Sequence, residues 1–154
     1  MRFLKSDPYN PDSPPLLVVD DDIETYRSAL PDEPSRKAFD AYLEAGRPYA
    51  IVIAVSEAVS GTRLSGQKDM RVTLDVVLEH RTVGDVRPPR RTLKALRNQV
   101  LRLIPQIDEL EHLVPLTVPL TYASGMPVGA KYQDPTTLTT TARFQGGWRM
   151  AASD

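Results

Sequence analysis

Two strand-like runs, separated by a polar stretch, constrain the fold of this chain more than any other feature. Residues 49–55 read Tyr-Ala-Ile-Val-Ile-Ala-Val and are apolar on both faces, which is typical of a strand inside a sheet. Residues 70–78 alternate between apolar and polar side chains, which indicates a strand with one buried face. Residues 56–69 between them are polar, contain two glycines and exceed the length of an ordinary hairpin connection. We therefore expect a long inter-strand loop.

Length and composition indicate a single folded domain. The chain has 154 residues, of which 41% are hydrophobic, enough to bury a core. Its formal net charge of −1 provides no overall field that would draw it to nucleic acid or an anionic membrane. There is no cysteine, which excludes disulfides, thiolate metal sites and a cysteine nucleophile. Without an apolar run of membrane-spanning length or a signal peptide, a soluble protein that stays where it is made is expected.

Prolines at the start of the chain predict a separate extended segment. Four of them, Pro8, Pro11, Pro14 and Pro15, lie within the first fifteen residues. Proline fixes its own backbone and removes a hydrogen-bond donor, so such a segment favours an extended conformation. We therefore expect an extended proline-rich arm over residues 1–15 and a single α+β domain over residues 16–154.

Three helices are predicted from capping residues and apolar stripes. The aspartates at 20–22 are suited to cap a short helix over residues 23–30. Ser35 is a candidate cap for a second helix, which ends at Gly46. Thr92 is a candidate cap for a third helix, which extends to residue 104 and carries leucine and valine at helical spacing.

The remaining segments predict further strands. Residues 16–19 are expected to pair as an edge strand, and residues 116–122 and 138–150 as two later strands with a loop at 124–135. The glycine pair at 146–147 suggests a bulge in the last strand. The predicted fold is α+β: a single mixed or antiparallel β-sheet with helices packed on one face, a long inter-strand loop and an extended N-terminal arm.

No set of residues suggests catalysis. Residues 16–22 resemble the first strand of a response-regulator receiver, whose acidic pair binds magnesium. A receiver also needs an acceptor aspartate after a later strand, and the run at 49–55 is followed by Ser56, so helix capping explains the aspartates better. His80 and His112 have no candidate nucleophile beside them. We expect no enzyme activity, no cofactor and no metal.

A basic cluster lies before and within the third predicted helix. Its members are Arg87, Arg90, Arg91, Lys94, Arg97 and Arg102. It could bind phosphate groups, form a solvated helix face, or pair with an acidic surface of another subunit. Candidate acidic surfaces are Asp20 to Asp22 with Glu24, Asp32 and Glu33, or Asp108, Glu109 and Glu111. Because no aromatic residues interleave with the arginines, specific nucleic-acid binding is not expected.

The order of these elements resembles the tail terminator proteins of long-tailed bacteriophages, a head–tail joining or neck family. The resemblance covers the Gly-Arg-Pro turn at 46–48, the apolar strand, the long loop and the alternating strand. It continues through the helix at 92–104 and the closing strand at 138–150. It is a match of order and pattern, and the first thirty residues depart from the simplest form of the family, which begins directly with a helix.

The resemblance implies a structural virion protein, assembled in the host cytoplasm, that forms a homo-oligomeric ring, a hexamer, at the head-proximal end of the tail. Such a ring terminates tail-tube polymerisation and joins the tail to the head. Its partners would be the tail tube protein and a head-completion or connector protein. Arg63 and Lys68 would be the charged contacts of the long loop. With the basic cluster, the expected subunit or partner interface comprises Arg63, Lys68, Arg87, Arg90, Arg91 and Arg97. Two alternatives stay open: a neck or head–tail completion protein, and a small degenerate receiver-like regulatory domain.

Overall fold

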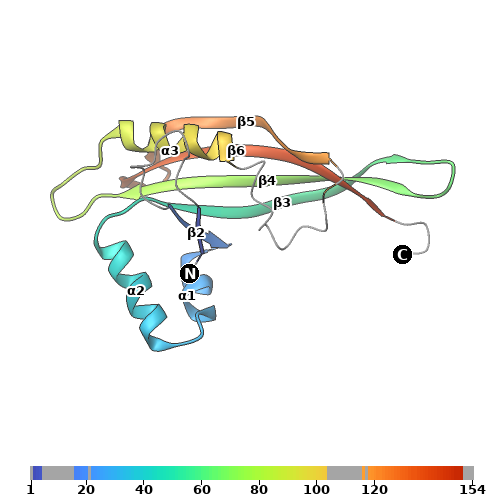
Figure 1. Cartoon of the computed structure of the whole chain (residues 1–154). Helices are drawn as coiled ribbons and strands as arrows, with labels where there is room; N and C mark the ends of the chain where they lie inside the picture. Colours follow the sequence, from blue (N-terminus) through green and yellow to red (C-terminus); the bar gives the residue numbers. More distant parts are fainter. Residues whose placement is uncertain (1, 5–15, 21, 104–115, 117, 151–154) are drawn as a thin grey trace.

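The protein is an α+β structure built on one mixed sheet (Figure 1). The computed structural model describes residues 2–4, 16–20, 22–103, 116 and 118–150. Within these ranges the strands are β1 (Arg2–Leu4), β2 (Leu16–Asp20), β3 (Tyr49–Thr62), β4 (Lys68–Arg81), β5 (Val118–Lys131) and β6 (Asp134–Met150). The helices are α1 (Ile23–Ala29), α2 (Glu33–Glu44) and α3 (Arg90–Leu103). The strand order is β1-β2-β3-β4-β6-β5, and among these described strands only β2 and β3 are parallel neighbours.

The predicted long loop is wrong, because most of residues 56–69 are strand. β3 continues to Thr62 and pairs with β4 in an antiparallel hairpin, from Tyr49 opposite Glu79 to Thr62 opposite Lys68. Only residues 63–67 form the connection. Hydrophobic periodicity identifies a strand by its buried face, and residues 53–60 of β3 are exposed on both faces. The hydrophobic pattern therefore stops near Val52, where burial stops, although β3 continues to Thr62.

The predicted packing of the helices on a single face of the sheet is also wrong. Along β2, Leu16 and Val18 belong to the core cluster that contains the α3 residue Leu93. Leu17 and Val19 belong to a second cluster around Phe39 of α2. Since neighbouring strand residues point to opposite faces, α3 covers one face and α1 with α2 covers the other (Figure 1). The strands β2 and early β3 are apolar on both sides because both sides are covered.

The starts of α1 and α2 are fixed by aspartate caps. Asp22 caps α1, as expected, and its carboxylate accepts the Thr25 backbone N–H at 2.8 Å. The predicted cap Ser35 is wrong: the cap of α2 is Asp32, whose carboxylate accepts the Ser35 backbone N–H at 2.8 Å. Gly46 follows α2 with φ of 70°, which confirms the helix stop predicted there.

The third helix begins two residues before the predicted cap. α3 starts at Arg90, so Thr92 lies in its first turn, and the Thr92 backbone N–H donates to the carbonyl of Pro89 at 3.2 Å. The apolar stripe is confirmed, since Leu93, Leu96 and Val100 are all buried. The proline pair before the helix explains the earlier start, because proline is readily accommodated at a helix N-terminus.

The end of the sheet also differs from the prediction. Residues 124–131 are not a loop but part of β5, which pairs with β6 through several irregularities of register. Pro119 and Pro127 are tolerated because β5 is an edge strand. The predicted bulge is on β5, between Val118 and Thr121, whereas β6 runs past β4 without a shift at Gly146 and Gly147.

The start of the chain departs from prediction in one respect. Residues 16–19 lie in β2, which is not an edge strand because β1 pairs with it on the side away from β3. Arg2–Leu4 therefore belongs to the sheet. The rest of the predicted arm, residues 5–15, and the acidic turn at 108–111 with His112 lie outside the described residues.

Candidate functional site: the projecting hairpin

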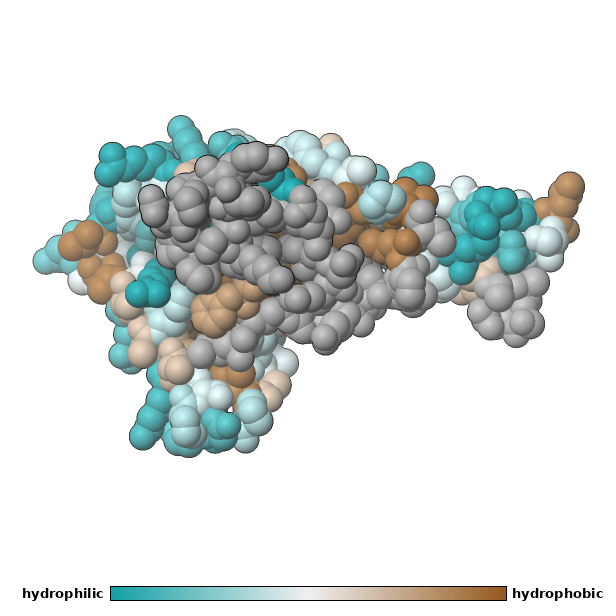
Figure 2. Space-filling view, viewed as in Figure 1, coloured by the Kyte–Doolittle hydropathy of each residue, from teal (hydrophilic) through white to brown (hydrophobic). Residues whose placement is uncertain are grey.

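The far half of the β3–β4 hairpin extends away from the helices (Figure 1). We call residues 53–74, with the turn at 63–67, the hairpin arm. The pairing of β2 with β3 ends at Val52, so in the described structure β3 has only β4 beside it from Ile53 onward. The arm carries exposed apolar side chains on β3, Val55 at 42% and Val59 at 52%, and Leu64 in the turn is fully exposed. Figure 2 shows a hydrophobic point at the far end of an otherwise mostly hydrophilic arm.

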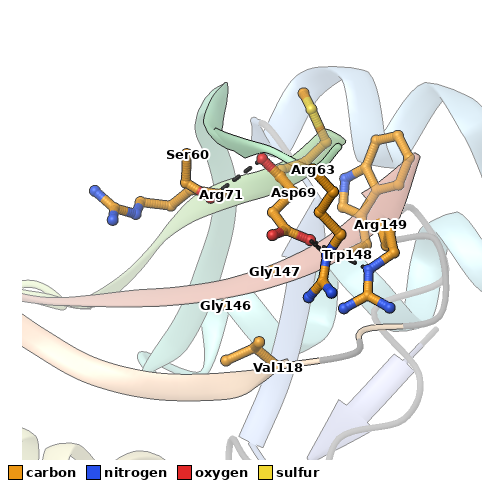
Figure 3. Close-up of a pocket in the computed structure, with 10 residues that line it drawn as sticks. Ser60, Arg63, Asp69, Arg71, Val118, Gly146, Gly147, Trp148 and Arg149 are labelled. Carbon is orange, nitrogen blue, oxygen red and sulfur yellow. Dashed lines mark hydrogen bonds and ion pairs between the residues drawn. The ribbon is translucent and has the colours of Figure 1, made fainter. Parts of the chain in front are cut away.

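Side chains from three strands brace the end of the arm (Figure 3). Asp69 lies between two guanidinium groups and accepts hydrogen bonds from Arg63 Nε at 3.4 Å and Arg149 Nε at 3.2 Å. The hydrogen bond from Arg149, followed by the charge of Arg63, holds the pKa of the Asp69 carboxyl below its usual value. Trp148 Nε1 donates to Glu57 Oε1 at 2.5 Å. These contacts tie the turn to β6 and keep the arm extended.

A pocket of about 310 Å³ lies at this end of the arm. Its lining includes Arg63, Asp69, Arg71, Trp148 and Arg149, with the backbone of the glycine pair at 146–147. A side chain at Gly147 would approach the Met70 carbonyl to 2.8 Å, so glycine is required by this close passage of strands. Three arginines and one aspartate make the pocket positively charged. In Figure 3 the guanidinium of Arg71 points away from the pair of arginines around Asp69.

The predicted interface residues fall into separate groups. Arg63 is the first residue of the turn at the end of the hairpin arm, and Lys68 follows that turn at the start of β4. Arg87, Arg90 and Arg91 lie before or at the start of α3, at the opposite end of the sheet (Figure 1). Arg87 and Arg91 are exposed. The structure therefore does not bring the six residues into one surface, and a contact of the α3 group with another subunit stays a prediction.

Two of the predicted interface arginines hold α3 against β5. Arg97 Nη1 donates to the carbonyl of Met126 at 2.6 Å, and Arg97 Nη2 donates to the Tyr122 hydroxyl at 2.9 Å. Arg90 Nη1 donates to the carbonyl of Val128 at 3.0 Å. These bonds satisfy backbone carbonyls of an irregular edge strand. Arg97 and Arg90 thus have an intramolecular role that their spacing in the sequence did not reveal.

A buried carboxylate is the polar group that sequence reasoning missed. Glu79 is 3% exposed; its two carboxylate oxygens accept the Tyr49 hydroxyl at 2.7 Å and Lys131 Nζ at 2.8 Å. Burial, together with this carboxylate, raises the pKa of the Tyr49 hydroxyl far above its ordinary value. Alternation placed Glu79 on the polar face of β4 but could not show that the face is covered there. The carboxylate is fully engaged, so the group resembles a structural network more than a reactive site.

The neighbouring histidine is also an internal group. His80 Nε2 lies 2.9 Å from the carbonyl oxygen of Gly46, beyond the end of α2. Burial lowers the pKa of the His80 imidazole, with the Gly46 bond opposing that shift. Its Nδ1 is buried and has no partner among the described residues. Its contact with Gly46 thus joins β4 to the end of α2.

The described residues hold neither a metal-ligand cluster nor a membrane-spanning helix. No group of three histidine, aspartate or glutamate side chains in these ranges is arranged to hold a metal ion. Among the helices described, none combines the length and the apolar character that crossing a bilayer requires. The hairpin arm therefore remains the strongest candidate for a functional surface.

Two sequence comparisons gave no match. No protein-family model matches the chain, and no curated protein matches it significantly in sequence. A function can therefore be inferred only from the geometry of the chain and from the order of its elements.

Proposed function

We propose that the protein is a structural virion subunit that forms a ring at the head-proximal end of a phage tail. There it terminates tail-tube polymerisation and joins the tail to the head. The observation that carries this proposal is the hairpin arm, which projects from the helix-covered part of the sheet and exposes Val55, Val59 and Leu64 to solvent. Exposed apolar side chains grouped on a projecting element favour a protein–protein contact.

The arm supports ring formation because it gives the molecule two different ends. A cyclic ring with more than two subunits needs two complementary surfaces on each copy, one for each neighbour. The arm occupies one end of the sheet, and α2 with the loop before α3 occupies the other (Figure 1). An arm at one end and a helical surface at the other supply such a pair without requiring any catalytic group.

The order of elements supports the resemblance to tail terminator proteins. The tail terminator resemblance includes a long loop between the two central strands, and this chain has the hairpin arm at that place instead. From β3 through β4 to α3, the chain has the same order of strand, strand and helix as in that resemblance. A long closing strand, β6, comes at the end. The proposed partners are further copies in a hexamer, the tail tube protein, and a head-completion or connector protein.

The two alternatives fare differently. A neck or head–tail completion protein from the same region of a virion would use the same arm, so it remains the second candidate. A receiver-like regulatory domain is disfavoured by topology. Receivers have a parallel doubly wound sheet, whereas here β2 and β3 are the single parallel pair among the described strands.

Electron microscopy of the purified protein, with light scattering over a range of concentrations, tests the proposal. Closed rings of uniform diameter are expected, and a protein that stays monomeric at the highest concentration would refute ring formation. Binding of these rings to the end of a purified tail tube, rather than to a head connector, separates a terminator from a neck protein.

A matched pair of variants tests the role of the arm. Leu64→Asp places a charge in the turn of the arm, and Met126→Asp places one at an exposed apolar residue of the edge strand β5, which belongs to neither proposed ring surface. Rings should be lost in the first variant and kept in the second, with both folded by circular dichroism. Loss of rings in both, or in neither, would mean that the arm is not the site of assembly.

A further inference from the structure

The end of the hairpin arm carries a surplus of positive charge. Over residues 57–71 and 145–150 there are four basic and two acidic side chains, namely Arg63, Lys68, Arg71 and Arg149 against Glu57 and Asp69. The single carboxylate of Asp69 is shared by two arginines. Lys68 and Arg71 are exposed and have no carboxylate partner in the described structure. The arm therefore carries uncompensated cations as well as the exposed apolar Leu64.

The surface of α1 and α2 has the opposite sign. Residues 22–44 contain six acidic side chains, Asp22, Glu24, Asp32, Glu33, Asp40 and Glu44, and three basic ones, Arg27, Arg36 and Lys37. Arg27 is bound by Asp40 at 2.8 Å, and Arg36 by Glu33 at 3.2 Å, so two of the three cations are already compensated. Glu24 and Glu44 are exposed and have no ion pair in the part of the chain that is described.

These two surfaces cannot meet within one molecule. The arm extends from the end of the sheet that is remote from α2, as Figure 1 shows. The helices contact the opposite end of β3, where Tyr49 belongs to their core cluster. The basic arm end and the acidic surface of α1 and α2 thus lie at different ends of the molecule. In a ring, they would face different neighbours.

We infer that the basic end of the hairpin arm of one subunit docks on the acidic surface of α1 and α2 of a second copy. This inference rests on the proposed ring and specifies its subunit contact. Because the two surfaces differ, the contact is heterologous and repeats from copy to copy, as a ring requires. Opposite charges set the register and the partner, while the apolar Leu64 is removed from water. Attraction between exposed charges decreases as salt increases, so ring formation should weaken between low and high ionic strength.

Charge reversal on each surface tests the contact. The arm variant is Lys68→Glu with Arg71→Glu, and the helix variant is Glu24→Lys with Glu44→Lys. None of these side chains forms a described ion pair, so both variants should keep the circular dichroism of the unmodified protein. Glu24 lies in the first turn of α1, where a lysine opposes the helix dipole, so the unfolding midpoint of the helix variant should fall slightly. In each variant alone, the arm and the α1–α2 surface carry charges of the same sign and repel each other. Self-association, measured by sedimentation velocity, should therefore weaken by on the order of a hundredfold.

Mixing the two variants gives the decisive measurement. The acidic arm of one variant matches the basic helices of the other, and the unmodified surfaces match each other, so an equimolar mixture should assemble again. A single chain with all four changes should also assemble. As a matched control, Arg91→Glu with Lys94→Glu makes the same charge change on α3, and its effect on association should be at least about tenfold smaller.

The outcomes separate this contact from the proposed function. If the unmodified protein and both reversal variants all form closed rings, the docking inference is overturned and ring formation stands. If reversal abolishes rings but neither the mixture nor the fourfold variant restores them, the two surfaces are not partners and the docking inference is again overturned. If the α3 control abolishes rings while the arm variant keeps them, the basic surface lies on α3. If the unmodified protein never assembles, both proposals are refuted.

Discussion

The two halves of β3 share one ladder of backbone pairing with β4 but differ sharply in burial. At the start of β3, Tyr49, Ala50 and Val52 are buried, and the sheet has helices on both faces. From residue 53 to residue 60 every side chain of the same strand is exposed. The difference shows that backbone hydrogen bonds extend a strand well beyond the core that stabilises it. Stability is concentrated in the near half, and the far half is free to serve a contact.

The largest expected effect is a core truncation in the near half. Leu78→Ala removes a side chain that is 1% exposed and packs beneath α3, so the free energy of unfolding should fall by about 2–5 kcal/mol. The matched change Val59→Ala in the arm should alter it by less than about 0.5 kcal/mol. Urea denaturation of both variants measures the contrast. Equal losses in the two would show that the arm is packed as tightly as the core.

A smaller effect is expected from the buried carboxylate of the near half. Tyr49→Phe removes the hydroxyl that donates to Glu79, leaving one oxygen of a buried carboxylate without that donor. The free energy of unfolding should fall by about 1.5–3 kcal/mol, as for other hydrogen bonds to charged groups. Tyr122→Phe, which removes a half-exposed hydroxyl, should cost clearly less. Chemical denaturation of both variants measures the two losses in free energy of unfolding. A larger loss for Tyr49→Phe than for Tyr122→Phe would support the buried bond to Glu79.

The pH dependence of two aspartates should distinguish a helix cap from an ion pair. The backbone N–H of Ser35 lowers the pKa of Asp32, whereas the side chain of Arg149 lowers that of Asp69. Both folded-state pKa values lie below the ordinary 3.8, so each group stabilises the fold above that pH, and this contribution is lost as the pH falls through the folded value. NMR titration in high salt should raise the pKa of Asp69 more than that of Asp32, because salt screens the charge of an arginine. Equal responses would contradict the ion-pair assignment.

The smallest effect on stability is expected at the tip of the arm. Leu64→Ser changes a fully exposed side chain, so the midpoint of thermal unfolding should not change measurably. Assembly, followed by light scattering, should nevertheless weaken because the apolar tip is lost. A clear drop in thermal stability of the monomer would show that the turn packs on its own subunit.

The parts of the fold that the sequence predicted are those that bury apolar side chains or cap a helix. Met70, Val72, Leu74, Val76 and Leu78 were expected on one face of β4, and all are buried except Met70, which is half-buried near the end of the arm. The cap at Asp22 and the helix stop at Gly46 were also predicted, because each needs a particular residue type. The helix-bearing half of the hairpin was therefore recognisable from local pattern alone.

The parts that could not be predicted depend on contacts between distant segments. Residues 56–62 look like a loop because a strand without a buried face has no hydrophobic period. The pairing of Glu79 with Lys131 joins residues far apart in the chain, and the same holds for Arg97 with Met126. The end of the arm likewise depends on Arg149, a residue of β6 that the sequence pattern placed only in a closing strand.

The irregular edge strand β5 limits how copies of this protein can combine. A flat strand with open hydrogen-bonding groups on one side would allow sheets to join edge to edge into an endless ribbon. In β5, Pro119 and Pro127 withhold two amide donors, and the repeated shifts of register prevent a straight approach. Growth by strand addition is thus blocked along this margin. The irregular β5 edge thus protects the protein from forming a fibre by strand addition along this side of the sheet.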